Sequence, residues 1–505
     1  MTRDTVPRIL VGAKRTCDYV FDALARLNSR DAQVTLCAVG SALPKCNAVA
    51  GVLAQKFSAE VVHTKIVPYA RRELPLAGME ITLAAGPLQE APESYRSLRN
   101  DGFIEYPVYE LLFNSFLTAK NALTIEIEDV YSGRVGRRGV RKSKSDSRLP
   151  ALVITRDDGL DYKITVPDQL TAPTVAKITR EEVLADVATA LSRSGILLSR
   201  SWEDVLTTLC RDDDAIIGLD TNVLRECIVS QQLLDGLIFN SPHWFVQAPN
   251  WLLFIIPNAV MHEIEQLANS RDTAGKLTQS GRLGYRALAE ILELDQSRDL
   301  GGISLLVVGE ADPVLDARVE LRGLRTDMRS RSRVVAALRR ISVGDTHVRD
   351  QFKQFLRQIS FHKGTYFLTA DKSNSALARA EGLSSVYFAP ALSDAVQKAG
   401  MLIRMPRILD DGGPPLTVPL GKIIFELAVQ CERIWLTAGE TRICVEADLA
   451  GESLINWVHK RLKIRGVHLK ALIENYSLKP RVPLVRAEEV WRELVRATMD
   501  EEAID

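Results

Sequence analysis

The feature that most constrains the fold is an alternation of short apolar segments and amphipathic helical segments over residues 213–395. The apolar segments read AIIGLD, WLLFIIP, ISLLVVG, GTYFLTAD and SVYFAPA. Such runs are typical of strands buried on both faces, and their separation by helices favours a parallel sheet. We therefore expect residues 213–395 to form an α/β domain with a three-layer α/β/α arrangement.

Four acidic residues of this block stand where parallel sheets usually bind their ligands. Asp220 and Asp371 each follow an apolar segment, Glu263 lies in the helix after the second segment, and Asp345 stands at an expected helix start. Because ligands bind at the carboxyl ends of parallel strands, we expect the four carboxylates to share one pocket. Convergent carboxylates repel one another and suit hard cations such as Mg²⁺ or Mn²⁺.

Each acid taken singly also has an ordinary structural role. An acid at a helix start usually caps the helix or interacts with its dipole, and this is the commoner role for Asp345 alone. Glu263 alone would be a solvated helix residue. Asp220 and Asp371 are harder to explain in this way because each directly follows apolar strand residues. The four acids together favour metal-dependent phosphodiester hydrolysis over a structural role.

Four segments of the block carry a family resemblance. LDTNVL, IPNAVMHEIEQL, the GD-x-x-V-R-D helix start and FLTADKSNSALARAEGL occur in this order. The block resembles the PIN domains, a family of Mg²⁺- or Mn²⁺-dependent ribonucleases of the 5′-nuclease-like superfamily. The resemblance implies catalytic, metal-binding acids at Asp220, Glu263, Asp345 and Asp371. It also implies polar support for the first and last acids from Thr221, Asn222 and Thr369.

The third acid of the resemblance has an alternative. Asp350 lies five residues after Asp345, which is about 500° around a helix, so the two acids cannot share one face. Asp345 has the apolar residue Val348 three positions later, as the motif requires, and we prefer it. His347 is a further local alternative, although an exposed helix position explains it equally simply.

The block departs from a compact PIN domain in the length between Glu263 and Asp345. The inserted stretch is rich in arginine, at Arg318, Arg322, Arg325, Arg329, Arg331, Arg333, Arg339 and Arg340. A helix with so many cations is either a solvated face or a contact for the RNA backbone. A basic rim would offset the repulsion between an acidic site and a polyanion.

The amino-terminal residues 1–90 predict a second, smaller α/β unit. The segments RILVGAK, CDYVFDALARL, QVTLCAV, ALPKCNAVAGVLAQKF, VVHTKIVPYA and MEITLAA read as strand, helix, strand, helix, strand and strand. This order favours a two-layer domain. These segments resemble the Alba family of dimeric archaeal nucleic-acid-binding proteins.

The Alba resemblance implies nucleic-acid contacts at a small set of basic residues. They are Lys14 and Arg15 in a loop, Lys45 at the second helix start, and Arg71 and Arg72 near a β-hairpin. One family position departs from this pattern, because Val39 stands where the family has an arginine. The alternative is an Alba-like unit that serves dimerisation or scaffolding only.

Two further blocks complete the predicted organisation. Residues 95–210 read as a β-rich region with a mobile basic loop at 134–148, and residues 400–505 read as a small α+β domain. The loop lacks apolar periodicity, and its Gly and Ser content is typical of a flexible segment. Its predicted RNA contacts are Arg134, Arg137, Arg138, Arg141 and Lys142, with Lys144 and Arg148 also basic.

Composition excludes several classes of protein. The chain has 505 residues, with 64 Lys+Arg against 64 Asp+Glu, so any nucleic-acid surface must come from local charge patterning. The 7 cysteines form no C-x-x-C pair, which favours reduced thiols over disulfides or a zinc site. The longest apolar run, 251–257, is far shorter than the roughly 20 residues of a membrane span. We expect a soluble, cytoplasmic protein.

These observations lead to one functional hypothesis and one alternative. We expect a Mg²⁺- or Mn²⁺-dependent endoribonuclease whose Alba-like domain and basic loop help to bind RNA. The expected partners are RNA, DNA through the Alba-like domain, and a second copy of the chain in a homodimer, with no membrane. The alternative is a catalytically silent RNA-binding or scaffold protein that retains the PIN fold.

Overall fold

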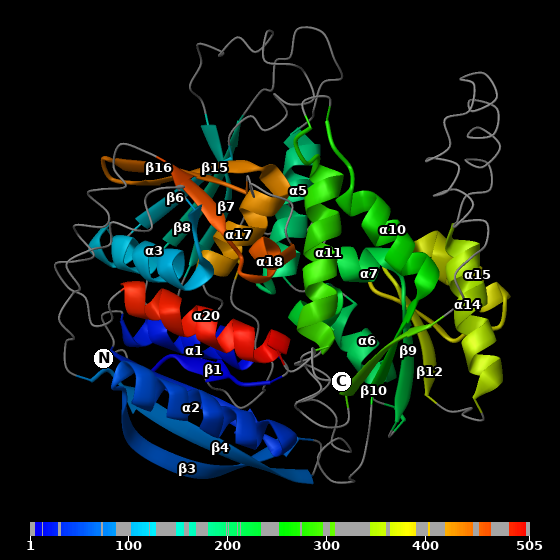
Figure 1. Ribbon diagram of the computed structural model, residues 1–505, viewed down its shortest axis with the longest axis horizontal. Helices are drawn as coiled ribbons and strands as arrows, with labels where there is room; N and C mark the ends of the chain where they lie inside the picture. The colour runs from blue at the N-terminus through cyan, green and yellow to red at the C-terminus, as the bar shows by residue number, and fades with distance from the viewer. Residues whose placement is uncertain are drawn as a thin grey trace, which may run out of the picture.

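The described part of the chain is a mixed α/β structure built on three β-sheets (Figure 1). The computed structural model describes residues 6–12, 14–28, 32–71, 74–86, 103–120, 122–127, 148–155, 161–167, 180–197, 199, 201–209, 211–212, 214–233, 252–272, 275–295, 303–308, 344–359, 364–389, 402–403, 420–447, 454–465 and 484–500. Within these residues, no helix is both long and apolar enough to cross a membrane.

The first sheet belongs to the amino-terminal unit and has the strand order β1-β2-β4-β3. The observed succession of strands and helices matches the one predicted for residues 8–86. The elements are β1 (Arg8–Leu10), α1 (Thr16–Leu27), β2 (Gln33–Val39), the short 3-10 helix η1 (Gly40–Ala42), α2 (Leu43–Phe57), β3 (Glu60–Arg71) and β4 (Leu74–Ala84). β1 and β2 are parallel, whereas β4 pairs antiparallel with both β2 and β3. Figure 1 places both helices on one face of this sheet.

The second sheet has five strands in the order β11-β10-β9-β12-β13, and every pairing is parallel. Its strands are β9 (Ala215–Leu219), β10 (Leu252–Pro257), β11 (Ile303–Val308), β12 (Thr365–Thr369) and β13 (Ser385–Tyr387). Every residue of β9 is buried, as the apolar runs predicted for strands covered on both faces. A parallel sheet in this block is therefore confirmed.

In the described residues of this block, six helices and one π-helical turn accompany the five-stranded sheet. They are α6 (Trp202–Leu209), α7 (Thr221–Arg225), η3 (Val229–Leu233), α10 (Asn258–Ala268), α11 (Gln279–Asp295), α14 (Asp345–Gln358) and α15 (Lys372–Ala380). The helix α14 approaches the central strand closely, since a Cβ on Gly218 would lie 2.8 Å from the Phe352 ring. The absent side chain of Gly218 thus leaves room for the Phe352 ring of α14 against β9.

The third sheet crosses a boundary that the sequence predicted. Its order is β14-β7-β8-β6-β15-β16-β17-β5. Residues 103–167 supply β5 (Phe103–Ile104), β6 (Ala122–Ile127), β7 (Arg148–Thr155) and β8 (Asp161–Pro167). Residues 402–465 supply β14 (Leu402–Ile403), β15 (Arg433–Ala438), β16 (Thr441–Glu446) and β17 (Leu462–Arg465). The regions 95–210 and 400–505, predicted as separate blocks, therefore build one sheet, because β6 pairs with β15, β7 with β14 and β5 with β17.

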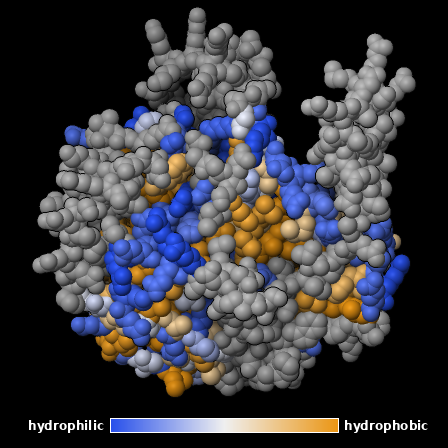
Figure 2. Space-filling view, viewed as in Figure 1, coloured by the Kyte–Doolittle hydropathy of each residue, from blue (hydrophilic) through white to orange (hydrophobic). Residues whose placement is uncertain are grey.

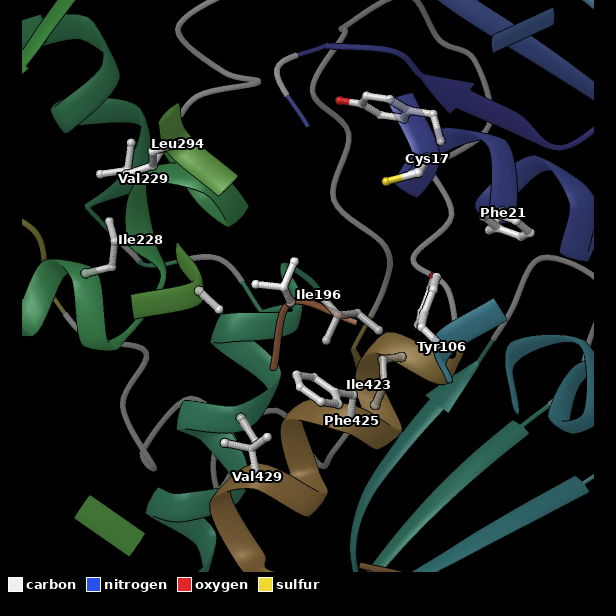
Figure 3. Packing of buried hydrophobic residues seen from close by; sticks show 14 of the residues in the cluster. Cys17, Phe21, Tyr106, Ile196, Ile228, Val229, Leu294, Ile423, Phe425 and Val429 are labelled. Atoms are coloured by element: carbon white, nitrogen blue, oxygen red, sulfur yellow. The ribbon is translucent and has the colours of Figure 1, made fainter. Parts of the chain in front are cut away.

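Five helices connect the third sheet to the rest of the molecule. They are α3 (Tyr106–Lys120), α5 (Arg180–Ser194), α17 (Leu420–Cys431), α18 (Leu454–Val458) and α20 (Leu484–Asp500). The carboxyl-terminal α20 lies beside α1 and α3 (Figure 1), where the Trp491 ring is 5.3 Å from Phe21 and 5.5 Å from Tyr106. The buried apolar residues of all three units form one continuous cluster (Figure 3).

The surface has one notable apolar region among the described residues. Val61, Val62 and Ile66 of β3 are 52%, 54% and 80% exposed. Figure 2 shows apolar patches at this lower edge of the view, over β3 and β4. Because β3 is the last strand of its sheet, its outer edge carries no strand pairing within the described residues.

Candidate functional site

Three of the predicted acids follow neighbouring strands of the five-stranded sheet. Asp220 directly follows β9, Glu263 lies in α10 after β10, and Asp371 comes two residues after the end of β12. β9 lies between β10 and β12, and the three strands are parallel. All three acids are therefore at the carboxyl edge of the sheet, with Asp220 in the middle.

Asp220 is buried and strongly hydrogen-bonded. Its Oδ2 accepts from Thr369 Oγ1 at 2.5 Å and from Asn374 Nδ2 at 2.9 Å. Its Oδ1 accepts from the backbone N–H of Thr221 at 2.8 Å, so the residue also caps α7. Burial raises the pKa of Asp220 above its ordinary value, and the negative charge of Asp345 raises it further, while the hydrogen bonds act in the opposite direction.

Thr221 joins the first two acids. Its backbone N–H contacts Asp220, and its hydroxyl donates a short hydrogen bond to Glu263 Oε2. Burial raises the pKa of Glu263, and the charges of Asp220 and Asp345 raise it as well. Asn222, the next residue, accepts the backbone N–H of Ala370 at 3.3 Å and so ties the β9 end to the β12 end.

The third acid of the cluster is Asp345 and not Asp350. Asp345 is the exposed first residue of α14, and its charge acts on both Asp220 and Glu263. Asp350 is exposed on the same helix and forms an ion pair with Lys353 at 2.7 Å. Asp345 is thus the one of the two whose charge is seen to act on Asp220 and Glu263, and its role as the third acid of a metal site stays a prediction.

Asp371 is engaged differently from the other three acids. Its Oδ1 accepts the backbone N–H groups of Ser373 at 2.6 Å and Asn374 at 3.1 Å, which makes it the N-cap of α15. α14, by contrast, begins at the N-cap Gly344 without a capping side chain. Asp345 is therefore an acid in the first turn of α14 but not its N-cap, whereas Asp220 and Asp371 are the N-caps of α7 and α15.

Sequence reasoning missed two residues of this site. Asn374 is fully buried in the first turn of α15 and donates to Asp220, although only its segment, and not the residue, was singled out. Arg349 is buried in α14, and its guanidinium donates to the Asn374 carbonyl oxygen and to Glu381. The only sequence signal for Asn374 was its position three residues after Asp371 at a helix start.

The cluster offers oxygen ligands but no closed metal shell. Among the described residues, no group of three or more His, Cys, Asp or Glu side chains lies close enough to hold a metal ion. The donor chemistry nevertheless fits a hard divalent cation, because mutually repelling carboxylates with raised pKa values gain most from a bound positive charge. Asp220 and Glu263, which Thr221 joins, are the two carboxylates that could hold such an ion with water in its remaining positions, and Asp345 adds negative charge nearby.

Two of the basic residues predicted to bind nucleic acid, Arg15 and Lys45, form contacts inside the molecule instead. Arg15 is 2% exposed, and it pairs with Asp18 at 2.9 Å and donates to the carbonyl of Val458 at 3.4 Å. Lys45 is buried, and its Nζ donates to the carbonyl of Lys14 at 3.0 Å. Neither cation is accessible to a phosphate in this structure, which corrects the prediction for both. Lys14 is half-buried.

Several other predicted contacts lie outside the described residues. Arg71 is the last residue of β3, and its side chain is not described. Arg72, the basic residues Arg134, Arg137, Arg138, Arg141 and Lys142, and the arginine-rich stretch before Asp345 are likewise outside the described ranges.

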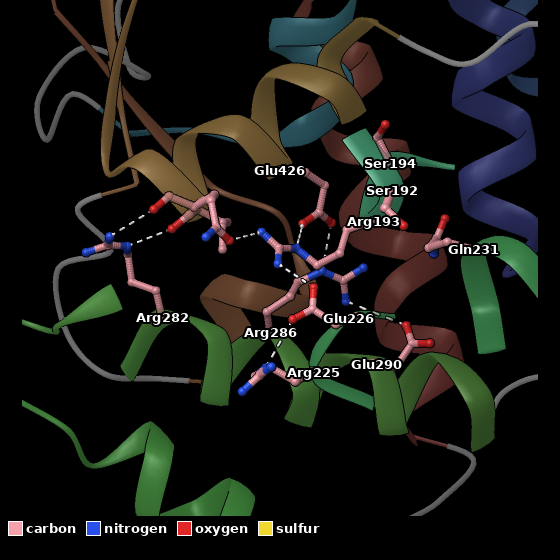
Figure 4. A network of polar contacts seen from close by, with 12 residues as sticks. Ser192, Arg193, Ser194, Arg225, Glu226, Gln231, Arg282, Arg286, Glu290 and Glu426 are labelled. Atoms are coloured by element: carbon pink, nitrogen blue, oxygen red, sulfur yellow. Dashed lines mark hydrogen bonds and ion pairs between the residues drawn. The ribbon is translucent and has the colours of Figure 1, made fainter. Parts of the chain in front are cut away.

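A second charged cluster, the buried ion network, lies deep in the molecule between α5, α11 and α17 (Figure 4). It extends to Arg15 and Asp18 at the start of α1 through Glu293, which lies 3.8 Å from Arg286 and 4.0 Å from Arg15. Glu426 accepts from Arg193 Nε at 3.0 Å and from Arg286 Nε at 2.9 Å. Burial opposes ionisation of Glu426, but the charges of Arg286 and Arg193 bring its pKa below the ordinary value. Every residue in this contact is at most 1% exposed, so the cluster belongs to the interior.

The comparisons with known proteins name no function for a similar protein, so the function is argued from the geometry of the site. No protein-family model matches the chain, and no curated protein matches it in sequence. Among solved structures, a domain of a functionally unknown protein from Methanocaldococcus jannaschii DSM 2661 is similar, with 19% sequence identity and a TM-score of 0.21. The match covers 35% of this chain and 91% of that domain. A TM-score of this size does not establish a common fold.

Proposed function

We propose that residues 213–395 form a PIN-like nuclease domain that hydrolyses RNA phosphodiesters with Mg²⁺ or Mn²⁺. The observation that carries the proposal is the placement of Asp220, Glu263 and Asp371 at the carboxyl edge of one parallel sheet, with Asp220 and Glu263 joined by Thr221. The electrostatics of these acids support it. Asp220 and Glu263 both have raised pKa values, and the charge of Asp345 acts on both. Among the described residues, no ion pair neutralises either of them, so a cation from solution is the natural complement.

The proposed division of labour follows the hydrogen bonds. Asp220 and Glu263 would hold the ion, with water completing its shell and the charge of Asp345 nearby. The ion would supply charge neutralisation for the phosphate and activation of water. Thr369 and Asn374 fix Asp220 Oδ2, which leaves Oδ1 with a single donor from the chain. Thr221 fixes Glu263 Oε2. We assign Asp371 to capping α15 and so to orienting Asn374, in place of the metal-binding role that the resemblance implies for it.

The structure changes which basic residues we propose to contact the RNA. Arg15 and Lys45 serve internal contacts, so we assign phosphate contacts to the basic segment 134–148 and to Arg71 and Arg72. An Alba-like unit would then act chiefly as a scaffold beside the nuclease domain. Unpaired RNA is the preferred substrate class, because single strands can enter a site between strand ends.

The test is cleavage of a labelled single-stranded RNA by the full-length chain. We expect Mg²⁺ or Mn²⁺ to be required, and Asp220→Asn to abolish cleavage with RNA affinity kept or slightly increased through reduced repulsion. Asp350→Asn is the matched control, since Asp350 is an exposed acid on α14 whose described partner is Lys353. Cleavage by Asp220→Asn at the wild-type rate would identify a contaminant and refute the proposal.

One observation favours a second candidate, a catalytically silent RNA-binding protein. Asp220 receives three hydrogen bonds from the chain, and Asp371 caps a helix, so both acids have structural roles without any ion. On this alternative, RNA binding persists in a metal chelator, no cleavage occurs with either metal, and neither ion raises the melting temperature.

A further inference from the structure

A buried chain of polar contacts links the surface of α15 to Asp220. Arg349 Nε and Nη2 donate to the two carboxylate oxygens of Glu381 at 3.1 and 2.8 Å. The remaining Nη1 donates a short hydrogen bond to Asn374 Oδ1. Asn374 Nδ2 in turn donates to Asp220 Oδ2 at 2.9 Å. The path thus runs from Glu381 through Arg349 and Asn374 to Asp220.

Arg349 decides which way round the Asn374 amide lies. A guanidinium has only donors, so the atom of Asn374 that faces it must be the carbonyl oxygen. The amide nitrogen is then the atom that faces Asp220, and it can only donate. Without the arginine the amide could rotate by half a turn, and its oxygen would meet the carboxylate with repulsion instead of a hydrogen bond.

We propose that Arg349 is a positioning residue that, by holding the Asn374 amide, sets the orientation of Asp220 for cation binding. The inference rests on the proposed function as far as the cation is concerned. With Oδ2 held by Asn374 and Thr369, the carboxylate presents the less occupied Oδ1. Partners of metal ligands in other proteins typically change ion affinity by about 10–100-fold when removed.

Lys353 provides a matched control for Arg349 within the same helix. Its Nζ donates to Glu381 Oε2 at 2.8 Å, so both cations contact the same carboxylate. Only Arg349 also contacts Asn374. A purely structural role in joining α14 to α15 would be shared by both residues, whereas the proposed role belongs to Arg349 alone.

The first measurement is calorimetric titration of the full-length chain with MnCl₂, with folding checked by circular dichroism. We expect Arg349→Met to weaken Mn²⁺ binding by about 10–100-fold and Lys353→Met to leave it unchanged. The Mn²⁺ affinity of Arg349→Lys should fall between those of the two Met variants, because a single ammonium cannot reproduce the planar guanidinium that donates to both Glu381 and Asn374. If Arg349→Met does not fold, Asn374→Ala must show the same loss of affinity. Wild-type affinity in a folded Arg349→Met or Asn374→Ala chain would overturn the inference.

The second measurement needs no metal and separates this inference from the proposed function. In protein labelled with ¹⁵N-asparagine, the side-chain amide signals of Asn374 are assigned by their loss in Asn374→Ala. Arg349→Met and Asp220→Ala should each shift them, and Lys353→Met should not. If the wild type binds no Mn²⁺, the proposed function fails while the amide signals still decide the positioning role. Unmoved signals in Arg349→Met would refute that role.

Discussion

The strand-edge acids and the buried ion network use the same residue types with opposite electrostatic results. At the strand edge, burial and the negative charge of Asp345 raise the pKa values of both Asp220 and Glu263 and so favour their protonated forms. In the network, Asp18 and Glu426 are also buried, with 6% and 1% of each residue exposed, yet their pKa values fall below the ordinary ones. Burial alone therefore does not determine the state of a carboxylate, and the placement of cations does.

The difference lies in how the cations are supplied. Asp18 accepts from Arg15 Nε at 2.9 Å and from Lys460 Nζ at 3.1 Å, so the chain itself neutralises this acid. The partners of Asp220 are neutral amide and hydroxyl groups. In the network, cations of the chain lie beside the acids, whereas the strand edge keeps a net negative charge that a cation from solution can balance.

The largest expected effect comes from breaking the network. Asp18→Asn leaves Arg15 and Lys460 buried without their shared carboxylate, and we expect a loss of about 3–5 kcal/mol in the free energy of unfolding. Urea denaturation at neutral pH measures this loss. Asp345→Asn serves as the strand-edge control and should not destabilise the chain. Equal losses in the two variants would show that the comparison is wrong.

The second effect is stabilisation by a cation at the strand edge alone. Mn²⁺ at about 100 times its dissociation constant should add about 2.7 kcal/mol to the free energy of unfolding, because it binds the folded chain only. Thermal or urea unfolding with and without the ion measures the gain. Glu263→Gln should remove it. A gain that survives in this variant would place the cation elsewhere on the molecule.

A third, smaller effect concerns repulsion in the absence of metal. Raised pKa values of Asp220 and Glu263 mean that the folded chain binds more protons than the unfolded chain, so stability falls as pH rises above the unfolded values. Asp345→Asn should flatten this fall and raise stability near neutral pH by less than about 1 kcal/mol. Urea titrations between pH 4 and 7 with a chelator present are the measurement. An unchanged slope would contradict the assignment of Asp345.

The smallest effect is expected at Glu381, a carboxylate paired with cations of the chain that is linked to the strand-edge acid Asp220 through Arg349 and Asn374. Hydrogen bonds from Arg349 and then Lys353 lower the pKa of Glu381 to about 2. Its stabilising effect is therefore complete above the unfolded pKa and disappears as pH falls toward 2. Glu381→Gln should cost less than about 1 kcal/mol, as for other partly exposed pairs. The difference in the free energy of unfolding between the wild type and Glu381→Gln, measured by urea denaturation, should disappear as the pH falls from about 4.5 to 2. A difference that stays constant over this range would contradict the pairing of Glu381 with Arg349 and Lys353.

Local patterns predicted the strand-edge acids because the relevant information is local. A buried parallel strand is a short apolar run, and its end is marked by the first polar residue, as at Asp220 and Asp371. Because the strands of this sheet are parallel, their carboxyl ends lie at the same edge, so these residues share that edge whatever the order of the strands. The contact between Thr221 and Glu263 follows from the same placement, because β9 and β10 are adjacent.

The predictions that the structure changed all depend on distant partners. Arg15 looks like an exposed loop cation until Val458 and the turn that follows it cover it. Strands at 122–127 and 433–438 are recognisable separately, but no pattern within either one names the other as its neighbour. Arg349 looks like any helix arginine until α15 places Asn374 against it.

The mixed origin of the eight-stranded sheet has a consequence for synthesis on the ribosome. Residues 214–389 emerge as one continuous stretch and contain every strand of their own sheet. β6 emerges earlier, yet one of its edges stays open until β15 leaves the exit tunnel. α1 likewise awaits contacts such as that between Arg15 and Val458, 443 residues apart. A nascent chain stalled before residue 433 thus displays an unpaired strand edge and an uncovered helix, the features by which chaperones and proteases recognise incomplete proteins.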